Sequence, residues 1–152
     1  MTKPRWLNED ERRAWRNLSL MQLQLFALLG RELGADGLSY QDYLVLAGLS
    51  DCEDNQARLV ELSRNLGWEK SRMSHHITRM EQRGLVAKIK CPTDQRGWYV
   101  TLTDTGRDAI AAAAPAHVAV VRAYFIDLLT SDELHTLDTI AARVLDHLPA
   151  SP

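Results

Sequence analysis

The sequence has few cysteines and no long apolar run, and both shortages restrict what the protein can be. Its two cysteines, Cys52 and Cys91, lie far apart and in no metal-ligand spacing, so we expect two reduced thiols rather than a disulfide scaffold. The most apolar stretch, AIAAAAPAHVAVV, has 13 residues and is interrupted by Pro115 and His117, which makes it too short to span a bilayer. The charged N-terminus lacks the apolar segment of a signal peptide. We therefore expect a cytoplasmic protein with no membrane partner.

The overall charge points to no partner, but its distribution along the chain does. The 152 residues are 45% hydrophobic and 25% charged, an ordinary globular balance that suits one domain, 1–152. Although the net charge is −2, residues 70–98 hold seven Lys and Arg against two acidic residues, so this window is +5 and the remainder −7. A basic patch on an otherwise acidic protein is typical of a surface that binds a polyanion.

The first half of the chain predicts four helices. Apolar residues recurring at three- and four-residue steps predict a long helix over 8–34, and Ser39 can cap a second helix over 39–50, with Tyr43, Leu46 and Ala47 on one face. A third helix is predicted over 55–65, ended by the left-handed turn that Gly67 allows. A fourth helix, 70–84, follows this tight turn directly.

The second half predicts a β-hairpin and two more helices. GLVAKIKC alternates apolar and basic residues as a half-buried strand does, and the loop PTDQRG joins it to a second strand, WYVTL. Thr103 or Asp104 can cap a helix running to about residue 129, with Pro115 kinking or dividing it. SDEL then begins the last helix without a full capping box, and an apolar stripe of seven residues follows. The fold class is mainly α with a small β-hairpin.

The fourth helix, KSRMSHHITRMEQRG, holds two adjacent histidines, for which we considered metal binding, catalysis and recognition of a polyanion. At about 100° per residue, Met73, Ile77 and Met80 face the core with Gly84, His75 points outward, and His76 lies at the edge of the core. Two histidines that diverge by this angle, with no carboxylate or thiol beside them, do not form a zinc site. No paired carboxylates or nucleophile motif accompany them, so we expect neither an enzyme nor a cofactor.

The outward face of this helix indicates DNA binding. A solvated polar face is the alternative, but it does not account for the short helix and Gly turn before it, or for the basic hairpin after it. A helix, a turn and a second helix with a basic outer face form the helix-turn-helix, whose second helix enters the major groove of double-stranded DNA. The predicted contacts are Lys70, Ser71, Arg72, Ser74, His75, Thr78 and Arg79 on the helix, with Lys88, Lys90 and Arg96 on the hairpin.

The segment ARLVELSRNLGWEKSRMSHHITRMEQRGLVAKIKCPTDQRGWYVTLTDTG resembles the MarR (multiple antibiotic resistance regulator) family of bacterial transcription factors. LSRNLGWEKS matches the start of its helix-turn-helix, RMEQRGLV leads into the first wing strand, and DQRGWYVTLTDTG matches the wing tip, second strand and next helix. The resemblance implies a winged helix-turn-helix core over 39–103, dimerisation helices over 5–34 and 104–149, and a homodimer on a pseudopalindromic operator. It also implies that Asp94 positions the wing and that Arg96 reaches the minor groove. Family members are usually repressors released by a small phenolic or other ligand, by cysteine oxidation or by metal.

Some departures from the family keep other hypotheses open. Glu69 stands where Ser, Thr or Asp more often caps the recognition helix, and the wing lacks a second Arg. Cys91, beside basic residues, could have a lowered pKa in a thiol- or metal-sensing regulator, although we favour an unreactive thiol. A winged-helix module that binds ligands or proteins without acting on DNA is the other alternative. Tyr40, Tyr43 and Trp15 could line a ligand site, but the sequence identifies no effector residue.

Overall fold

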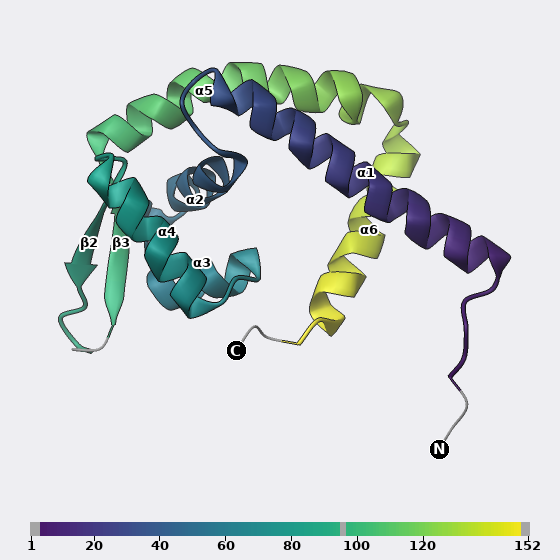
Figure 1. The fold of residues 1–152 in the computed structure, drawn as a ribbon, viewed down its shortest axis with the longest axis horizontal. Helices are drawn as coiled ribbons and strands as arrows, with labels where there is room; N and C mark the ends of the chain where they lie inside the picture. Colours follow the sequence, from purple (N-terminus) through teal and green to yellow (C-terminus); the bar gives the residue numbers. More distant parts are fainter. Residues whose placement is uncertain (1–3, 95–96, 150–152) are drawn as a thin grey trace.

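The computed structural model describes residues 4–94 and 97–149 (Figure 1). Its elements, in chain order, are α1 (Glu9–Gly34), α2 (Tyr40–Ser50), the 3-10 turn η1 (Glu53–Asn55), β1 (Gln56–Arg58), α3 (Leu59–Leu66), α4 (Lys70–Gln82), β2 (Val86–Lys90), β3 (Trp98–Leu102), α5 (Asp104–Tyr124), the 3-10 turn η2 (Ile126–Leu128) and α6 (Ser131–His147).

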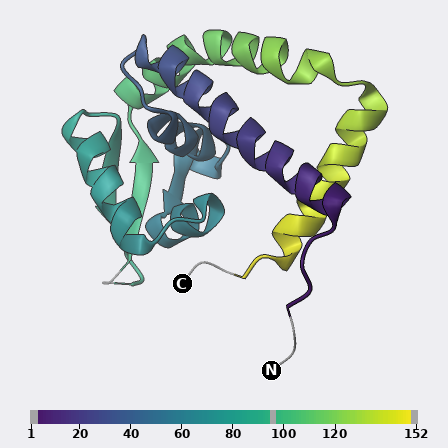
Figure 2. The ribbon, with the colours of Figure 1, turned by 45° about the vertical axis from the view of Figure 1, so that its right-hand side comes forward.

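The elements form two regions. Helices α2 to α4 and the sheet gather into one compact lobe, while α1 and α5 run side by side away from it and α6 descends from the far end of α5 (Figures 1 and 2). The predicted fold class, mainly α with a winged helix-turn-helix, is confirmed.

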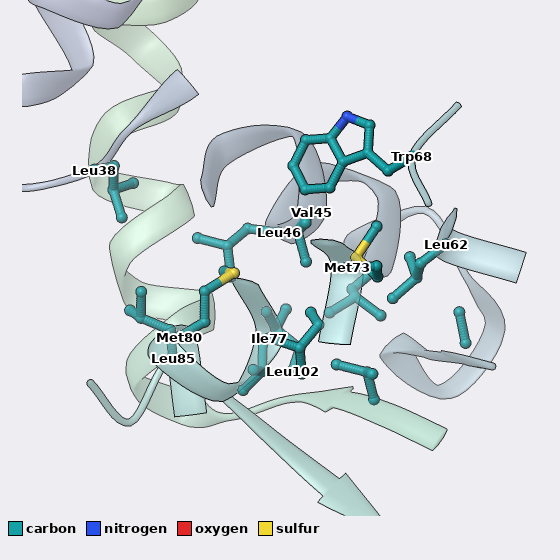
Figure 3. Packing of buried hydrophobic residues seen from close by; sticks show 14 of the residues in the cluster. Leu38, Val45, Leu46, Leu62, Trp68, Met73, Ile77, Met80, Leu85 and Leu102 are labelled. Atoms are coloured by element: carbon teal, nitrogen blue, oxygen red, sulfur yellow. The ribbon is translucent and has the colours of Figure 1, made fainter. Parts of the chain in front are cut away.

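The core of the lobe forms where α4 crosses α2 and the sheet (Figure 3). The predicted stripe on α4 is confirmed for Met73, Ile77 and Met80, which are all 0% exposed, but it is wrong for Gly84, which is exposed and follows the end of the helix with a φ of 74°. The predicted face of α2 is partly wrong. Its most buried side chains are Asp42, Val45, Leu46 and Leu49, whereas Tyr43 and Ala47 are only half-buried. Tyr43 turns toward α5 instead, where its ring lies 4.1 Å from that of His117.

The sheet has three strands, one more than the predicted hairpin. β3 pairs antiparallel with β2 on one side and with β1 on the other, with Ala57 opposite Val100. The prediction of a helix over 55–65 is therefore wrong at its start. Asp54 and Asn55 adopt positive φ angles of 57° and 52°, which redirect the chain alongside β3 before α3 begins. QAR carries little strand propensity of its own, so the hydrogen bonds to β3 determine its conformation.

Burial along β2 decreases toward the wing tip rather than alternating as predicted. Leu85 and Val86 at its start are 5% and 2% exposed, whereas Ile89 near its end is 50% exposed. The end of the strand lies beyond the hydrophobic core, although Tyr99, which pairs with Ile89, is half-buried beside Arg58.

α5 is one continuous helix with Pro115 inside it, so the prediction that Pro115 divides it is wrong. Thr103 caps its first turn and donates to Gly84 O, and Gly106 packs so closely on the sheet that a Cβ there would overlap Leu85 O. α6 begins with a complete capping box between Thr130 and Glu133, contrary to prediction.

The prediction that the apolar stretch around Pro115 is too short to span a bilayer is also wrong. Asp104–Leu128 is long and apolar enough to cross a bilayer, with a mean hydropathy of 1.6 in its most apolar window. One such helix is weak evidence for a membrane span, because helices of protein cores and interfaces have the same composition. The N-terminal half of α5 lies against the lobe, where Ala113 is 0% exposed.

Candidate nucleic-acid interface

A tight turn between α3 and α4 sets the direction of the recognition helix. Gly67 adopts the left-handed conformation, with φ 64° and ψ 30°, as predicted. The N–H of Trp68 donates to Ser63 O at 2.9 Å, which closes the turn. Glu69 occupies the N-cap of α4, as the sequence indicated, but its side chain caps no backbone N–H and accepts instead from Ser71 Oγ at 3.2 Å. The turn thus places α4 across the lobe with one face on the core and the other outside.

The outer face of α4 presents most of the predicted contacts. Thr78 is half-buried; its hydroxyl donates to Ser74 O at 3.0 Å and accepts from Lys88 Nζ at 3.2 Å. His75 is exposed and His76 is 8% exposed, so the two histidines diverge as the helical wheel predicted. The exposed members of the predicted set on this helix are Lys70, Ser71, Arg72, Ser74, His75 and Arg79.

Lys88, predicted as a DNA contact, points back to α4. Its Nζ lies 3.3 Å from Glu81 Oε2 and 3.2 Å from Thr78 Oγ1, and its backbone N–H donates to Glu81 Oε1 at 3.0 Å. This clamp joins the recognition helix to the wing. Lys88 is therefore better placed to hold the two elements together than to reach a phosphate.

Beyond Lys88, the described part of the wing presents exposed side chains to the solvent. Lys90 is exposed and its Nζ lies 5.6 Å from the centre of the Trp98 ring, which is itself 40% exposed. Asp94 is exposed, and its carbonyl accepts from Gly97 N at 2.9 Å, which closes the loop. Arg96, the predicted minor-groove contact, lies outside the described residues.

Asp42 lies behind α4 in a buried polar cluster that sequence analysis missed. Its carboxylate accepts from Arg83 Nη1 at 2.7 Å and from Ser39 N at 2.9 Å, and it lies 3.1 Å from His76 Nε2. Burial alone would raise the pKa of Asp42, but the contacts with His76, Arg83 and Ser39 hold it well below its ordinary value. Arg83 also donates to Gly37 O, so the cluster ties the end of α4 to the start of α2.

The whole chain is similar to known regulators of transcription. A family model described as transcriptional regulator SarA/Rot matches residues 28–113. Transcriptional activatory protein BadR of Rhodopseudomonas palustris is 31% identical over 123 residues, which cover 78% of this chain and 68% of BadR. The crystal structure of AbsC, a MarR family transcriptional regulator from Streptomyces coelicolor, is 38% identical with a TM-score of 0.89, over 95% of this chain and 97% of AbsC.

A second structure from the same organism adds DNA. Sco3205, a MarR family transcriptional regulator crystallised in complex with DNA, is 34% identical with a TM-score of 0.92, over 97% of this chain and 94% of that one. The chain belongs to the MarR family. It is accordingly a transcriptional regulator of MarR type, with the DNA-binding winged helix of that family.

The two cysteines lie in different surroundings, which bears on the hypothesis of a thiol- or metal-sensing regulator. Cys91 is 4% exposed, and its Sγ lies 3.3 Å from Thr93 Oγ1 and 3.8 Å from Arg58 Nη2. The hydrogen bonds with Thr93 lower the pKa of the Cys91 thiol, helped by Arg58 and opposed by burial. Cys52 donates to Gly48 O in another part of the lobe. Within residues 4–94 and 97–149, no three His, Cys, Asp or Glu side chains are grouped to hold a metal ion.

Sequence analysis missed Asp42 and Glu81 for different reasons. Asp42 stands three residues after Ser39, a capping-box spacing that indicates a helix start but does not show that the same carboxylate is buried against α4. Glu81 counted as a negative charge within a basic window, and nothing in the sequence showed its pairing with Lys88.

Proposed function

We propose that the protein is a homodimeric, sequence-specific regulator that binds a pseudopalindromic operator through α4 and the wing. The proposal rests on the outer face of α4. This face presents hydroxyls, an imidazole and arginines, which can contact bases and phosphates, and α4 has no carboxylate between Lys70 and Arg79. The DNA complex of Sco3205, 34% identical to this chain, supports the same mode of binding.

The proposed contacts have distinct roles. Arg79 is exposed in the C-terminal half of α4 and is the proposed base-reading residue. A bidentate Arg–guanine pair is the commonest specific contact in the major groove. Ser74 and His75 would contact bases or phosphates beside it. Lys70, Ser71, Arg72 and Lys90 would contact phosphates, with Asp94 and Arg96 at the wing tip.

The terminal helices are proposed to form the dimer interface, with residues 39–103 as the DNA-binding core and 5–34 and 104–149 as dimerisation helices. α6 has no buried residue, and its apolar stripe is open: Ile140, Val144 and Leu145 are 50%, 52% and 68% exposed. On α1, Trp15 is 63% exposed. Apolar surface of this extent on a regulator is typical of an interface, and a two-fold dimer would place two α4 helices about one DNA turn apart.

A small molecule is the proposed effector, and an open groove between α1, α2 and α4 is where it would bind. Its apolar part, about 480 Å³, includes the stacked rings of Phe26 and Tyr40, and a polar part of about 460 Å³ adjoins it beside Arg72. Two structures of the same fold hold ligands: an organohalide-sensing regulator with 2,4-dichlorophenol, 21% identical, and CouR of Rhodococcus jostii with p-coumaroyl-CoA, 19% identical. At these identities they share the fold, and they support an effector without indicating its chemistry.

We further propose that the protein acts in the cytoplasm and represses by occupying its operator until the effector binds. The operator's position relative to the promoter decides the direction of regulation. The relative BadR is named as an activatory protein, so activation is the alternative direction.

The test is binding of the purified protein to duplex DNA from upstream of its own gene, at low salt, where phosphate contacts are strongest. We expect a specific complex, and Arg79→Ala should weaken it by about 1–3 kcal/mol and relax base preference at one position. Arg79→Lys, which keeps the charge at the same position but lacks the planar guanidinium needed for a bidentate contact, is the control. No specific complex with the wild-type protein would refute the proposed function, and equal loss on operator and random DNA would reassign Arg79 to a phosphate.

A further inference from the structure

His76 is a buried histidine whose two ring nitrogens both face polar groups. Its Nε2 lies 3.1 Å from Asp42 Oδ1, and its Nδ1 lies 3.1 Å from Arg79 Nη2. Its ring packs edge-on against Trp68, with 5.3 Å between the ring centres. The imidazole thus links a buried carboxylate on α2 to an exposed arginine on the outer face of α4.

The chemistry of Arg79 fixes the proton on this imidazole. A guanidinium has only donors, so the contact with Arg79 requires a lone pair on Nδ1, and the single proton of the neutral ring then lies on Nε2. Nε2 is buried without a well-aligned hydrogen bond among the described residues, and Asp42 Oδ1 lies 3.1 Å from it. Asp42 is 5% exposed in its side chain and is held in place by Arg83 and by the cap at Ser39.

We propose that Asp42 and His76 are positioning residues that orient Arg79 for base recognition, an inference that rests on the proposed DNA-binding function. Arginine loses considerable side-chain freedom when it binds, and an orientation fixed before binding reduces that loss. The hydrogen bond to His76 occupies one of five guanidinium N–H groups, so the other four remain for a base pair. The spacing of three residues along α4 brings the two side chains together, and the anchor on α2 prevents the ring from turning.

A purely structural role for His76, as a filler beside Trp68, is the competing explanation, and three substitutions separate the two. In His76→Phe the ring remains and both nitrogens are lost. In His76→Asn an oxygen occupies nearly the position of Nδ1, so the acceptor for Arg79 is restored. In His76→Gln the polar atoms lie one bond further out, toward Asp42, and that acceptor is absent.

The experiment measures the ratio of affinities for two duplexes at fixed salt: one enriched from a random-sequence library by the wild-type protein, and a scrambled duplex of equal length. We expect His76→Phe and His76→Gln to lower this preference about threefold to tenfold, the value of one hydrogen bond, and His76→Asn to retain most of it. In an Arg79→Ala background, none of the three should lower the preference further, because the effect passes through Arg79. Thermal unfolding of each variant confirms that the folded protein is being compared.

Three results would overturn the proposal. Equal losses for Phe and Asn would show that packing alone matters, and additive losses in the Arg79→Ala background would show that His76 acts independently of Arg79. An unchanged preference in Arg79→Ala itself would remove Arg79 as the base-reading residue, while operator binding by the wild-type protein would leave the proposed function standing. Nitrogen NMR of the wild-type protein provides a check that no variant can obscure: we expect the neutral ring of His76 to carry its proton on Nε2, and a neutral ring with its proton on Nδ1 would contradict the proposal.

Discussion

Replacing Asp42 with Asn tests how far one buried carboxylate holds the DNA-binding lobe together. The substitution keeps the size and one oxygen but places an NH2 group among donors, so either Arg83 or His76 loses its acceptor. A hydrogen bond to a charged group contributes about 1.5–3 kcal/mol, and the 43% exposure of the Arg83 side chain lets water solvate its charge in part. We therefore expect a loss of about 2 kcal/mol in the free energy of unfolding, which is about 4–8 °C in Tm for a chain of this length.

The pH dependence gives the same prediction a second measurement. The pKa of Asp42 is lower in the folded protein than in the unfolded chain, so its stabilisation is complete above the unfolded value of about 4 and is lost as the pH falls further. The difference between wild type and Asp42→Asn should thus be full at pH 7 and shrink in acid. Urea unfolding at equal protein concentration measures it, since a dimer's stability depends on concentration. A difference below about 0.5 kcal/mol at pH 7, or one that does not change in acid, would refute the reasoning.

Two further predictions concern packing and assembly. Gly106→Ala should destabilise the protein by about 1–3 kcal/mol, because the added Cβ would overlap Leu85 O. The control, Gly48→Ala, has open space around it in α2 and should leave stability unchanged or raise it. Equal unfolding midpoints for the two variants would contradict the close packing of α5 on the sheet. Leu145 is 68% exposed within the chain, so Leu145→Glu should leave the fold of the subunit intact. A two-fold interface contains this side chain twice, so the substitution removes two apolar contacts, and we expect the dissociation constant of the dimer to rise about a hundredfold or more. Sedimentation that shows an unchanged dimer would exclude α6 from the interface.

Several features of the site were predictable because they depend on neighbours in sequence. The spacing of Met73, Ile77 and Met80 placed the core face of α4, and the same wheel separated His75 from His76. Gly67 indicated the turn before the helix, and its left-handed conformation is confirmed. Such features follow from 3.6 residues per turn and from the conformations open to glycine, which are local properties of the chain.

Other features were not predictable because their partners are distant in sequence. β1 forms only because β3 is beside it, although 43 positions separate the paired residues Ala57 and Val100. Lys88 looked like a free cation until its pairing with Glu81 was visible. A basic residue counts equally toward a charge total whether it faces DNA or an internal carboxylate, so sequence composition overstated the surface charge of the window.

The sequence by itself determined the family, the order of the helices and the outward face of the recognition helix, because each depends on local periodicity and short motifs. Only the tertiary structure decided which polar residues of that region are available to DNA and which hold the lobe together. Asp42 meets Arg83 across 41 residues and reaches His76 through the packing of α2 on α4, and no local pattern records such a contact. Charged groups pair according to where the chain brings them, and their availability is a property of the folded molecule.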